Sequence, residues 1–190
     1  MPWLNYWGSQ DKIRVEKGSE FMKFVPYVYD EDNNQIPVSI SHATKEDLES
    51  TNDEPVWQTS WTEDYLTKSG FECYAVKVQE ELIALGAYEV KSNQLFVYIV
   101  YMESEPHSNP TLTNRRKYRG IGRVLIAQGI RLSVDSGFGG DVVLRAKTPQ
   151  LENHYIEDYG AVKLPTFDSS APRYLIADDA AKRIFFSYLK

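Results

Sequence analysis

Cysteine is almost absent from this sequence, because Cys73 is the single one. One cysteine excludes an intrachain disulfide and a cysteine-rich zinc site, and it suits a reducing compartment. Cys73 lies in the apolar run Phe71 to Val78 with no base paired to it, which favours a structural thiol over a nucleophile. The sequence therefore predicts no metal site.

Long apolar runs are also missing. No stretch of about 18 apolar residues, the length that spans a bilayer, occurs anywhere in the chain. The N-terminal residues include Asp11, Lys12, Arg14 and Glu16, where a secretory signal would need an apolar stretch. Together these absences predict a cytoplasmic protein without a membrane partner.

An excess of positive charge is absent as well. The chain has 21 Lys and Arg against 27 Asp and Glu, a net charge of -6. Nucleic-acid binding depends on neutralising phosphates with Lys and Arg, so we expect no nucleic-acid partner. The 42% hydrophobic and 25% charged residues are typical of a globular protein, and 190 residues fit one domain.

The first residues carry a sequence of their own. Gly18-Ser19-Glu20-Phe21 is typical of the peptide encoded by two adjacent cloning sites, and Met22 follows as a native start. Two interpretations fit residues 1–21 equally, a vector-derived or disordered extension and a genuine N-terminal extension. We assign residues 1–21 no function and predict a single domain over residues 22–190.

Apolar runs bounded by turn residues predict an antiparallel meander in the first half. The expected strands are Lys23 to Tyr29, Val38 to Ser41, Phe71 to Val78, Leu82 to Val90 and Leu95 to Met102. Asp30 to Gln35 and Lys91 to Gln94 are predicted turns. Thr44, followed by Glu46 and Asp47, predicts a helix N-cap and a short helix to about Ser50.

The second half changes to alternating helices and strands. An apolar arc predicts a helix over Gly120 to Asp135, and three glycines end it at residues 137–140. We then expect a strand at Asp141 to Ala146, a helix at Pro149 to Tyr159, a strand at Arg173 to Ala177 and an amphipathic end at Ala180 to Leu189. The predicted class is α+β, a mixed and mostly antiparallel twisted sheet flanked by helices.

The most informative segment is Arg115-Arg116-Lys117-Tyr118-Arg119-Gly120-Ile121-Gly122-Arg123. It lies between a predicted buried strand and the long helix. Two glycines permit a tight approach, and a helix start presents unpaired N–H groups with the positive end of its dipole, so we expect a phosphate there. A tight strand-to-helix connection is the alternative. A Rossmann site would need a third glycine where Arg123 stands.

At this segment the sequence resembles the GNAT superfamily of acyl-CoA-dependent N-acetyltransferases. The family signature is Arg or Gln, two residues, Gly, one residue, then Gly or Ala, and it aligns with Lys117, Gly120 and Gly122. Lys117 departs from the usual first residue, although Arg116 is beside it. The resemblance covers about residues 37 to 165 and implies the GNAT-like acyl-CoA N-acyltransferase fold.

The resemblance implies acetyl-CoA as the cofactor. Backbone amides of the turn would hold its diphosphate, which carries over to Lys117, Tyr118, Arg119, Gly120, Ile121, Gly122 and Arg123. The strand before the turn would pair with the pantetheine arm through Val100, Tyr101 and Met102. The connection from Glu103 to Arg116 is longer than usual, and it resembles an acidic loop with Pro and Asn found in one branch of bacterial relatives.

Transfer to an amine needs a base for the amine proton and an acid for the leaving thiolate. Glu103, at the exit of the cofactor strand, is the predicted base, with Glu105 and His107 as second choices; the alternative is that all three are solvated loop charges. Tyr155 is the predicted thiolate acid. The family's tyrosine slot falls on Ile156, one residue later, so core packing is the alternative role for Tyr155.

Trp57, Trp61, Asp64 and Tyr65 form an aromatic and acidic cluster at the expected acceptor side of the cleft. Ring faces and a carboxylate can receive a cationic amine, together with Glu105 and His107. Core packing is the alternative for at least one tryptophan. The predicted activity is acetyl transfer from acetyl-CoA to a primary amine of a small molecule, peptide or protein.

Two other functions fit the same turn. A binding or regulatory module could keep the acyl-CoA pocket without turnover, and a nucleotide-binding protein could use the turn for another phosphate. Tighter binding of ATP or NAD than of CoA would favour the latter. Exposed strand edges and the C-terminal helix permit a homodimer without requiring one.

Overall fold

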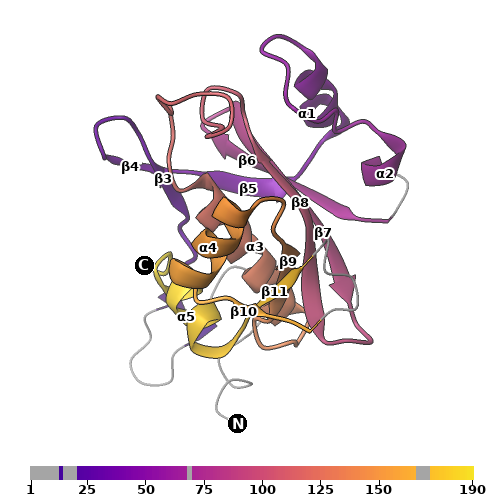
Figure 1. The fold of residues 1–190 in the computed structure, drawn as a ribbon. Helices are drawn as coiled ribbons and strands as arrows, with labels where there is room; N and C mark the ends of the chain where they lie inside the picture. Colours follow the sequence, from indigo (N-terminus) through magenta and orange to yellow (C-terminus); the bar gives the residue numbers. More distant parts are fainter. Residues whose placement is uncertain (1–12, 15–20, 68–69, 166–171) are drawn as a thin grey trace. The chain divides into compact units, whose positions relative to one another are not determined.

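The computed structural model describes residues 13–14, 21–67, 70–165 and 172–190 (Figure 1). By its internal contacts the chain divides into two compact units. The first unit consists of Pro26–Glu89 and Val100–Leu125, and the second of the chain up to Val25, Val90–Ile99 and Ile126–Lys190. In the described parts, every helix is too short or too polar to cross a membrane. The single domain over residues 22–190 stays a prediction.

Seven strands form one mixed sheet in the order β10-β11-β9-β8-β7-β6-β5. β8 and β9 run parallel, whereas β5 with β6, β6 with β7, β9 with β11 and β10 with β11 run antiparallel. The strands are β5 Ser39–His42, β6 Glu72–Val78, β7 Glu81–Lys91, β8 Phe96–Ser104, β9 Val142–Arg145, β10 Val162–Lys163 and β11 Arg173–Ile176. This confirms the predicted α+β class with a mostly antiparallel sheet.

In the first unit, helix α1 (Lys45–Glu49) begins where the sequence predicts it. Thr44 Oγ1 accepts from Asp47 N at 3.1 Å and Asp47 Oδ2 accepts from Thr44 N at 2.9 Å, a reciprocal capping box. Lys77 Nζ lies 2.6 Å from Asp47 Oδ1. Burial would raise the pKa of Asp47, but the hydrogen bonds from Lys77 and Thr44 outweigh it and lower the pKa. The sequence missed η1 (Ser50–Asn52) and α2 (Asp64–Thr67).

The predicted strand Lys23 to Tyr29 is shorter in the structure and forms half of a hairpin. β3 (Tyr27–Tyr29) pairs antiparallel with β4 (Gln35–Pro37), a strand that the sequence did not predict. Pro26 has no N–H to donate to a ladder, which explains why the strand starts after it. Asp30 Oδ1 accepts from Asp32 N at 3.0 Å and from Asn34 N at 2.8 Å, and these bonds close the hairpin turn.

The second unit contains β1 (Ile13–Arg14), β2 (Phe21–Met22), α4 (Pro149–Glu157) and α5 (Asp178–Phe186), and α3 (Ile121–Asp135) is shared by both units. Thr148 Oγ1 caps α4 by accepting from Leu151 N at 3.3 Å, and Gly160 follows with a φ of 71°. The α3 and α4 predictions are right to within two residues. Apart from Ile13, Arg14 and Phe21, the predicted N-terminal extension lies outside the described residues.

Because Gly86 in β7 has no side chain, the ring of the buried Tyr88 can pack directly against its Cα. A Cβ at Gly86 would lie 2.6 Å from Tyr88 Oη and 2.8 and 2.9 Å from two of its ring carbons. Tyr88 is fully buried and donates from Oη to Leu125 O at 2.8 Å, so the ring cannot move aside. We therefore expect Gly86→Ala to lower the free energy of unfolding by about 1–3 kcal/mol, measured by urea unfolding.

Gly122→Ala is the matched control for this substitution, because no described heavy atom lies within 4 Å of a Cβ built there. We expect its stability to stay within about 0.5 kcal/mol of the parent or to rise. Equal stabilities for Gly86→Ala and Gly122→Ala would contradict the steric role of Gly86.

Candidate functional site

The N-terminus of α3 is open. Gly120 precedes the helix with a φ of 87°, which an L side chain rarely adopts, and Val124 N makes the first helical bond, to Gly120 O at 3.2 Å. Within the ranges that the structure describes, no protein acceptor lies at hydrogen-bonding distance of the N–H groups of Gly120, Ile121 and Gly122. Three N–H groups at the positive end of a 15-residue helix suit an anion.

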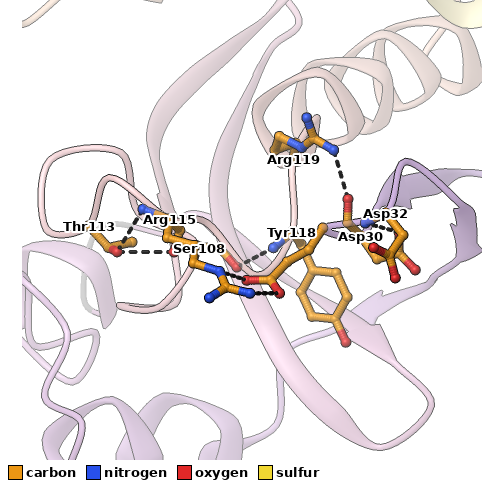
Figure 2. A network of polar contacts seen from close by, with 8 residues as sticks. Asp30, Asp32, Ser108, Thr113, Arg115, Tyr118 and Arg119 are labelled. Carbon is orange, nitrogen blue, oxygen red and sulfur yellow. Dashed lines mark hydrogen bonds and ion pairs between the residues drawn. The ribbon is translucent and has the colours of Figure 1, made fainter.

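The three preceding amides are already engaged by protein oxygens. Lys117 N donates to His107 O at 3.0 Å, Tyr118 N to Ser108 Oγ at 3.0 Å and Arg119 N to Tyr29 O at 2.8 Å. Figure 2 shows the bond between Tyr118 and Ser108. The N–H groups of Lys117, Tyr118 and Arg119 therefore stabilise the turn and are not available to a phosphate in this structure. The N–H groups that can bind a phosphate are those of Gly120, Ile121 and Gly122.

Basic side chains of the turn are held by acceptors of the same unit. Arg115 forms a bidentate pair with Glu31, with both N···O distances at 2.9 Å. Lys117 Nζ lies 2.6 and 2.8 Å from the carboxylate oxygens of Glu81, and this hydrogen bonding raises the pKa of Lys117. Both pairs are exposed and contribute little to stability. The positive charges of Arg115 and Lys117 are thus balanced by Glu31 and Glu81.

Two tyrosines of β3 lie beside the start of α3, and neither was predicted from the sequence to lie there. The Tyr29 ring approaches to 3.8 Å of where a Cβ of Gly120 would stand. The Tyr27 and Tyr29 rings meet edge to face at 5.5 Å. The pKa of Tyr27 is raised above its usual value. Hydrogen bonding to Tyr29 is the largest cause and burial also contributes, while the positive charge of Arg123 offsets part of the rise. No sequence signal pointed to them, because their strand was not expected to pair with the turn.

Glu103 lies near the end of β8 with only 5% of its surface exposed. Its Oε1 accepts from Gln58 N at 2.7 Å, and its Oε2 accepts from Trp61 Nε1 at 3.1 Å. The hydroxyls of Thr59 and Tyr101 meet at 2.7 Å, and Tyr101 lies two residues before Glu103 on β8. Glu103 thus anchors the loop from Trp57 to Trp61 on β8.

The predicted acceptor cluster divides into a buried and an exposed part. Trp61 has no exposed surface and Trp57 is 8% exposed. Both belong to an apolar cluster of the first unit with Leu66, Ala75, Leu85 and Ala87. The core-packing alternative therefore describes Trp61. Asp64 and Tyr65 on α2 are exposed, and Tyr65 makes an edge contact with Phe71 at 5.7 Å.

Glu105 is buried and holds the long loop after β8. Its carboxylate accepts from His107 N at 2.7 Å and from Ser108 Oγ, and its own N–H donates to Ile83 O at 2.9 Å. Asn109 Nδ2 donates to Gln58 Oε1 at 3.1 Å, which joins this loop to the loop that Glu103 anchors. Glu105 is committed to these bonds, whereas the side chain of His107 is exposed.

The ladder between β8 and β9 covers Val97 to Ile99. The predicted pantetheine residues Val100, Tyr101 and Met102 come next along β8, and all three are half-buried. Their backbone groups lie outside the ladder with β9. Among the described residues, no group of three or more His, Cys, Asp or Glu side chains could hold a metal ion.

Tyr155 belongs to α4 in the second unit. It is 6% exposed, and its ring centroid lies 6.4 Å from that of Tyr159 and 6.2 Å from that of Tyr174. Burial, with a smaller effect of Tyr159, raises its pKa from 10.0 to about 12. No hydrogen bond joins the Tyr155 hydroxyl to another described residue. The phenol therefore stays protonated at neutral pH and has a proton to donate.

This raised pKa makes stability depend on alkaline pH. A pKa of about 12 in the folded state against 10.0 means that the neutral phenol stabilises the fold fully below pH 10, and that this contribution is lost as the pH rises toward 12. Between pH 9 and 11 we expect the parent to lose about 1 kcal/mol more stability than Tyr155→Phe. Urea unfolding at pH 9, 10 and 11 measures this, and parallel losses would contradict the shift.

Neither a protein-family model nor a curated protein matches the sequence. Solved structures are similar to it. A ribosomal-protein-S18-alanine N-acetyltransferase from Escherichia coli is 14% identical with a TM-score of 0.52, and the match covers 74% of this chain and 95% of that one. A putative streptothricin acetyltransferase from Bacillus anthracis, in complex with acetyl coenzyme A, is 14% identical with a TM-score of 0.51, covering 77% and 100%.

A GNAT-family acetyltransferase from Listeria monocytogenes is 10% identical, with a TM-score of 0.51 over 74% of this chain and 94% of its own. At such low identities these likenesses show the fold. The chain has the fold of the GNAT acetyltransferases, which confirms at the level of the fold the resemblance stated from residues 117–122.

Proposed function

We propose that this protein is an N-acetyltransferase that moves an acetyl group from acetyl-CoA to a primary amine. One observation carries the proposal: three N–H groups without protein acceptors stand at the start of α3, in a fold shared with acetyltransferases. One of those structures holds acetyl coenzyme A. A diphosphate is the part of this cofactor that such N–H groups recognise.

The cofactor would be held by backbone groups of the first unit. Gly120, Ile121 and Gly122 would donate to the diphosphate, and Val100, Tyr101 and Met102 would pair with the pantetheine arm. Lys117, Tyr118 and Arg119 would keep the turn in shape through the bonds that their amides make. Arg123, in the first turn of α3, would add positive charge.

Acetyl-CoA supplies an acetyl group activated as a thioester. Glu103 would receive the proton that the attacking amine loses, directly or through water, as the new C–N bond forms and the C–S bond breaks. The N–H groups of Gln58 and Trp61 hold its carboxylate oriented. Tyr155 would give its phenolic proton to the departing sulfur. Its raised pKa, to about 12, keeps that proton in place until then.

The amine would enter past exposed residues of the first unit. Asp64 and Tyr65 on α2 offer a carboxylate and a ring to a cationic group, and His107 lies exposed on the loop after β8. Trp57, almost buried, would shape the wall rather than supply a ring face. The acceptor is thus proposed as a small-molecule, peptide or protein amine.

A thermal-shift series with CoA thioesters, followed by thiol release with a panel of amines, tests the proposal. Because a ligand that binds only the folded chain stabilises it, acetyl-CoA should raise the melting temperature, and at least one amine should release CoA. Binding without thiol release from any amine would overturn catalysis. Absence of both would overturn the cofactor assignment.

A non-catalytic acyl-CoA-binding module is the second candidate, favoured by one observation. Both carboxylate oxygens of the proposed base already accept protein N–H groups, as a purely structural carboxylate would. Turnover that disappears in Glu103→Gln would exclude this reading.

A further inference from the structure

The β3–β4 hairpin is joined to the start of α3 by backbone hydrogen bonds. Tyr29 N donates to Arg119 O at 2.9 Å, and Arg119 N donates to Tyr29 O at 2.8 Å. The two residues form an isolated antiparallel bridge directly before Gly120. This bridge sets Tyr29 beside the three N–H groups that lack protein acceptors.

Arg119 also holds the hairpin through its side chain. Its Nη2 donates to Asp30 O at 2.8 Å, drawn in Figure 2, and to Asn33 Oδ1 at 2.7 Å. Arg115 pairs with Glu31 in the same turn, at an exposed place. The arginine thus reaches the carbonyl next to Tyr29 as well as the far side of the hairpin turn, so the position of the Tyr29 backbone is determined from two sides.

Tyr29 keeps an exposed aromatic surface at this place. Its ring lies 3.8 Å from where a Cβ of Gly120 would stand, and the residue is still 36% exposed. Tyr27 supports the ring by an edge-to-face contact at 5.5 Å. A supported aromatic ring therefore lies against Gly120, the first of the three residues whose N–H groups lack protein acceptors.

We propose that Tyr29 provides the surface on which the nucleobase of the diphosphate-bearing ligand stacks, and that Arg119 is the positioning residue for that ring. Every nucleobase has a π face, so stacking on tyrosine needs no further polar group. The inference rests on the proposed function and adds to it a residue that discriminates nucleotide-bearing thioesters from shorter ones. It also gives the hairpin a role in binding.

Steady-state kinetics with two thioesters test this inference. Acetyl-CoA carries the base, whereas S-acetyl-4′-phosphopantetheine lacks the 3′-phosphoadenosine and keeps only one phosphate of the diphosphate. Tyr29→Leu should raise the KM for acetyl-CoA about tenfold or more with kcat unchanged, because a base–aromatic contact is lost. The KM for the shorter thioester should not move. Tyr29→Phe, which keeps the ring, should recover most of the loss.

Arg119→Met should produce the same selective rise in KM, and Arg119→Lys should recover part of it, as expected for a positioning residue. Phe186→Leu, which replaces an aromatic ring that is 50% exposed on α5, is the matched control. An equal change for both thioesters in Tyr29→Leu, with the parent active, would overturn the inference alone. A parent that consumes neither thioester would overturn the proposed function and this inference with it.

Discussion

Gly122→Asp should raise the KM for acetyl-CoA by about 100-fold or more while making the protein slightly more stable. The carboxylate would stand in the first turn of α3, where it interacts favourably with the helix dipole by about 0.3–1 kcal/mol. The position has no positive φ, and no described heavy atom lies within 4 Å of an added Cβ. The same charge would repel a diphosphate and compete for the N–H groups it needs.

Gly122→Asn is the matched control, since it has the same shape without the charge. Stability comes from urea unfolding, and KM from thiol release. We expect the Asn variant to lose much less affinity than the Asp variant, and both to stay folded. If the Asp variant were more stable and its KM for acetyl-CoA unchanged, the diphosphate would not bind at this helix end, and the proposed function would lose its main support.

Glu103→Gln should lower kcat by about 100-fold or more, the smaller end of what a positioned general base contributes. It should also lower the free energy of unfolding by about 1–3 kcal/mol. A glutamine amide has one accepting oxygen, so either Gln58 N or Trp61 Nε1 loses its acceptor in a buried place. Thiol-release kinetics and urea unfolding measure the two effects separately.

Two further variants distinguish a role of Glu103 as general base from a role as a structural anchor of the loop. Trp61→Phe removes the N–H donor to Glu103 Oε2 and part of a buried ring but leaves the carboxylate, so we expect lower stability and a smaller loss of kcat than in Glu103→Gln. Glu63→Gln changes an exposed carboxylate of the same region and controls for net charge. The acid limb of kcat/KM against pH should vanish in Glu103→Gln. A limb that persists would leave Glu103 as an anchor and place the base elsewhere.

Local chemistry explains which elements could be predicted. Thr44 with Asp47 forms a cap because its donors and acceptors are three residues apart. The apolar arc after Gly120 makes a helix whose open end follows from helix geometry alone. These features depend on neighbours in the chain, so periodicity and capping residues were enough to place them.

Long-range pairing explains what was missed. Arg119 and Asp30 are 89 residues apart, and Glu103 meets partners 45 and 42 residues before it. Trp61 and Asp64 stood together as one cluster in the sequence, yet the first is fully buried and the second exposed. No local pattern distinguishes a tryptophan that packs in a core from one that lines a cleft.

The sequence by itself determined the class of the fold, the open helix end after Gly120 and its suitability for a phosphate, because period, glycine placement and helix dipole are properties of short segments. Only the tertiary structure decided which amides of the turn remain available, which oxygens of Glu103 and Glu105 are already engaged, and that Tyr29 lies beside the helix end. Those outcomes depend on which distant donors and acceptors fold together, and buried polar groups take whichever partners the packing brings within reach.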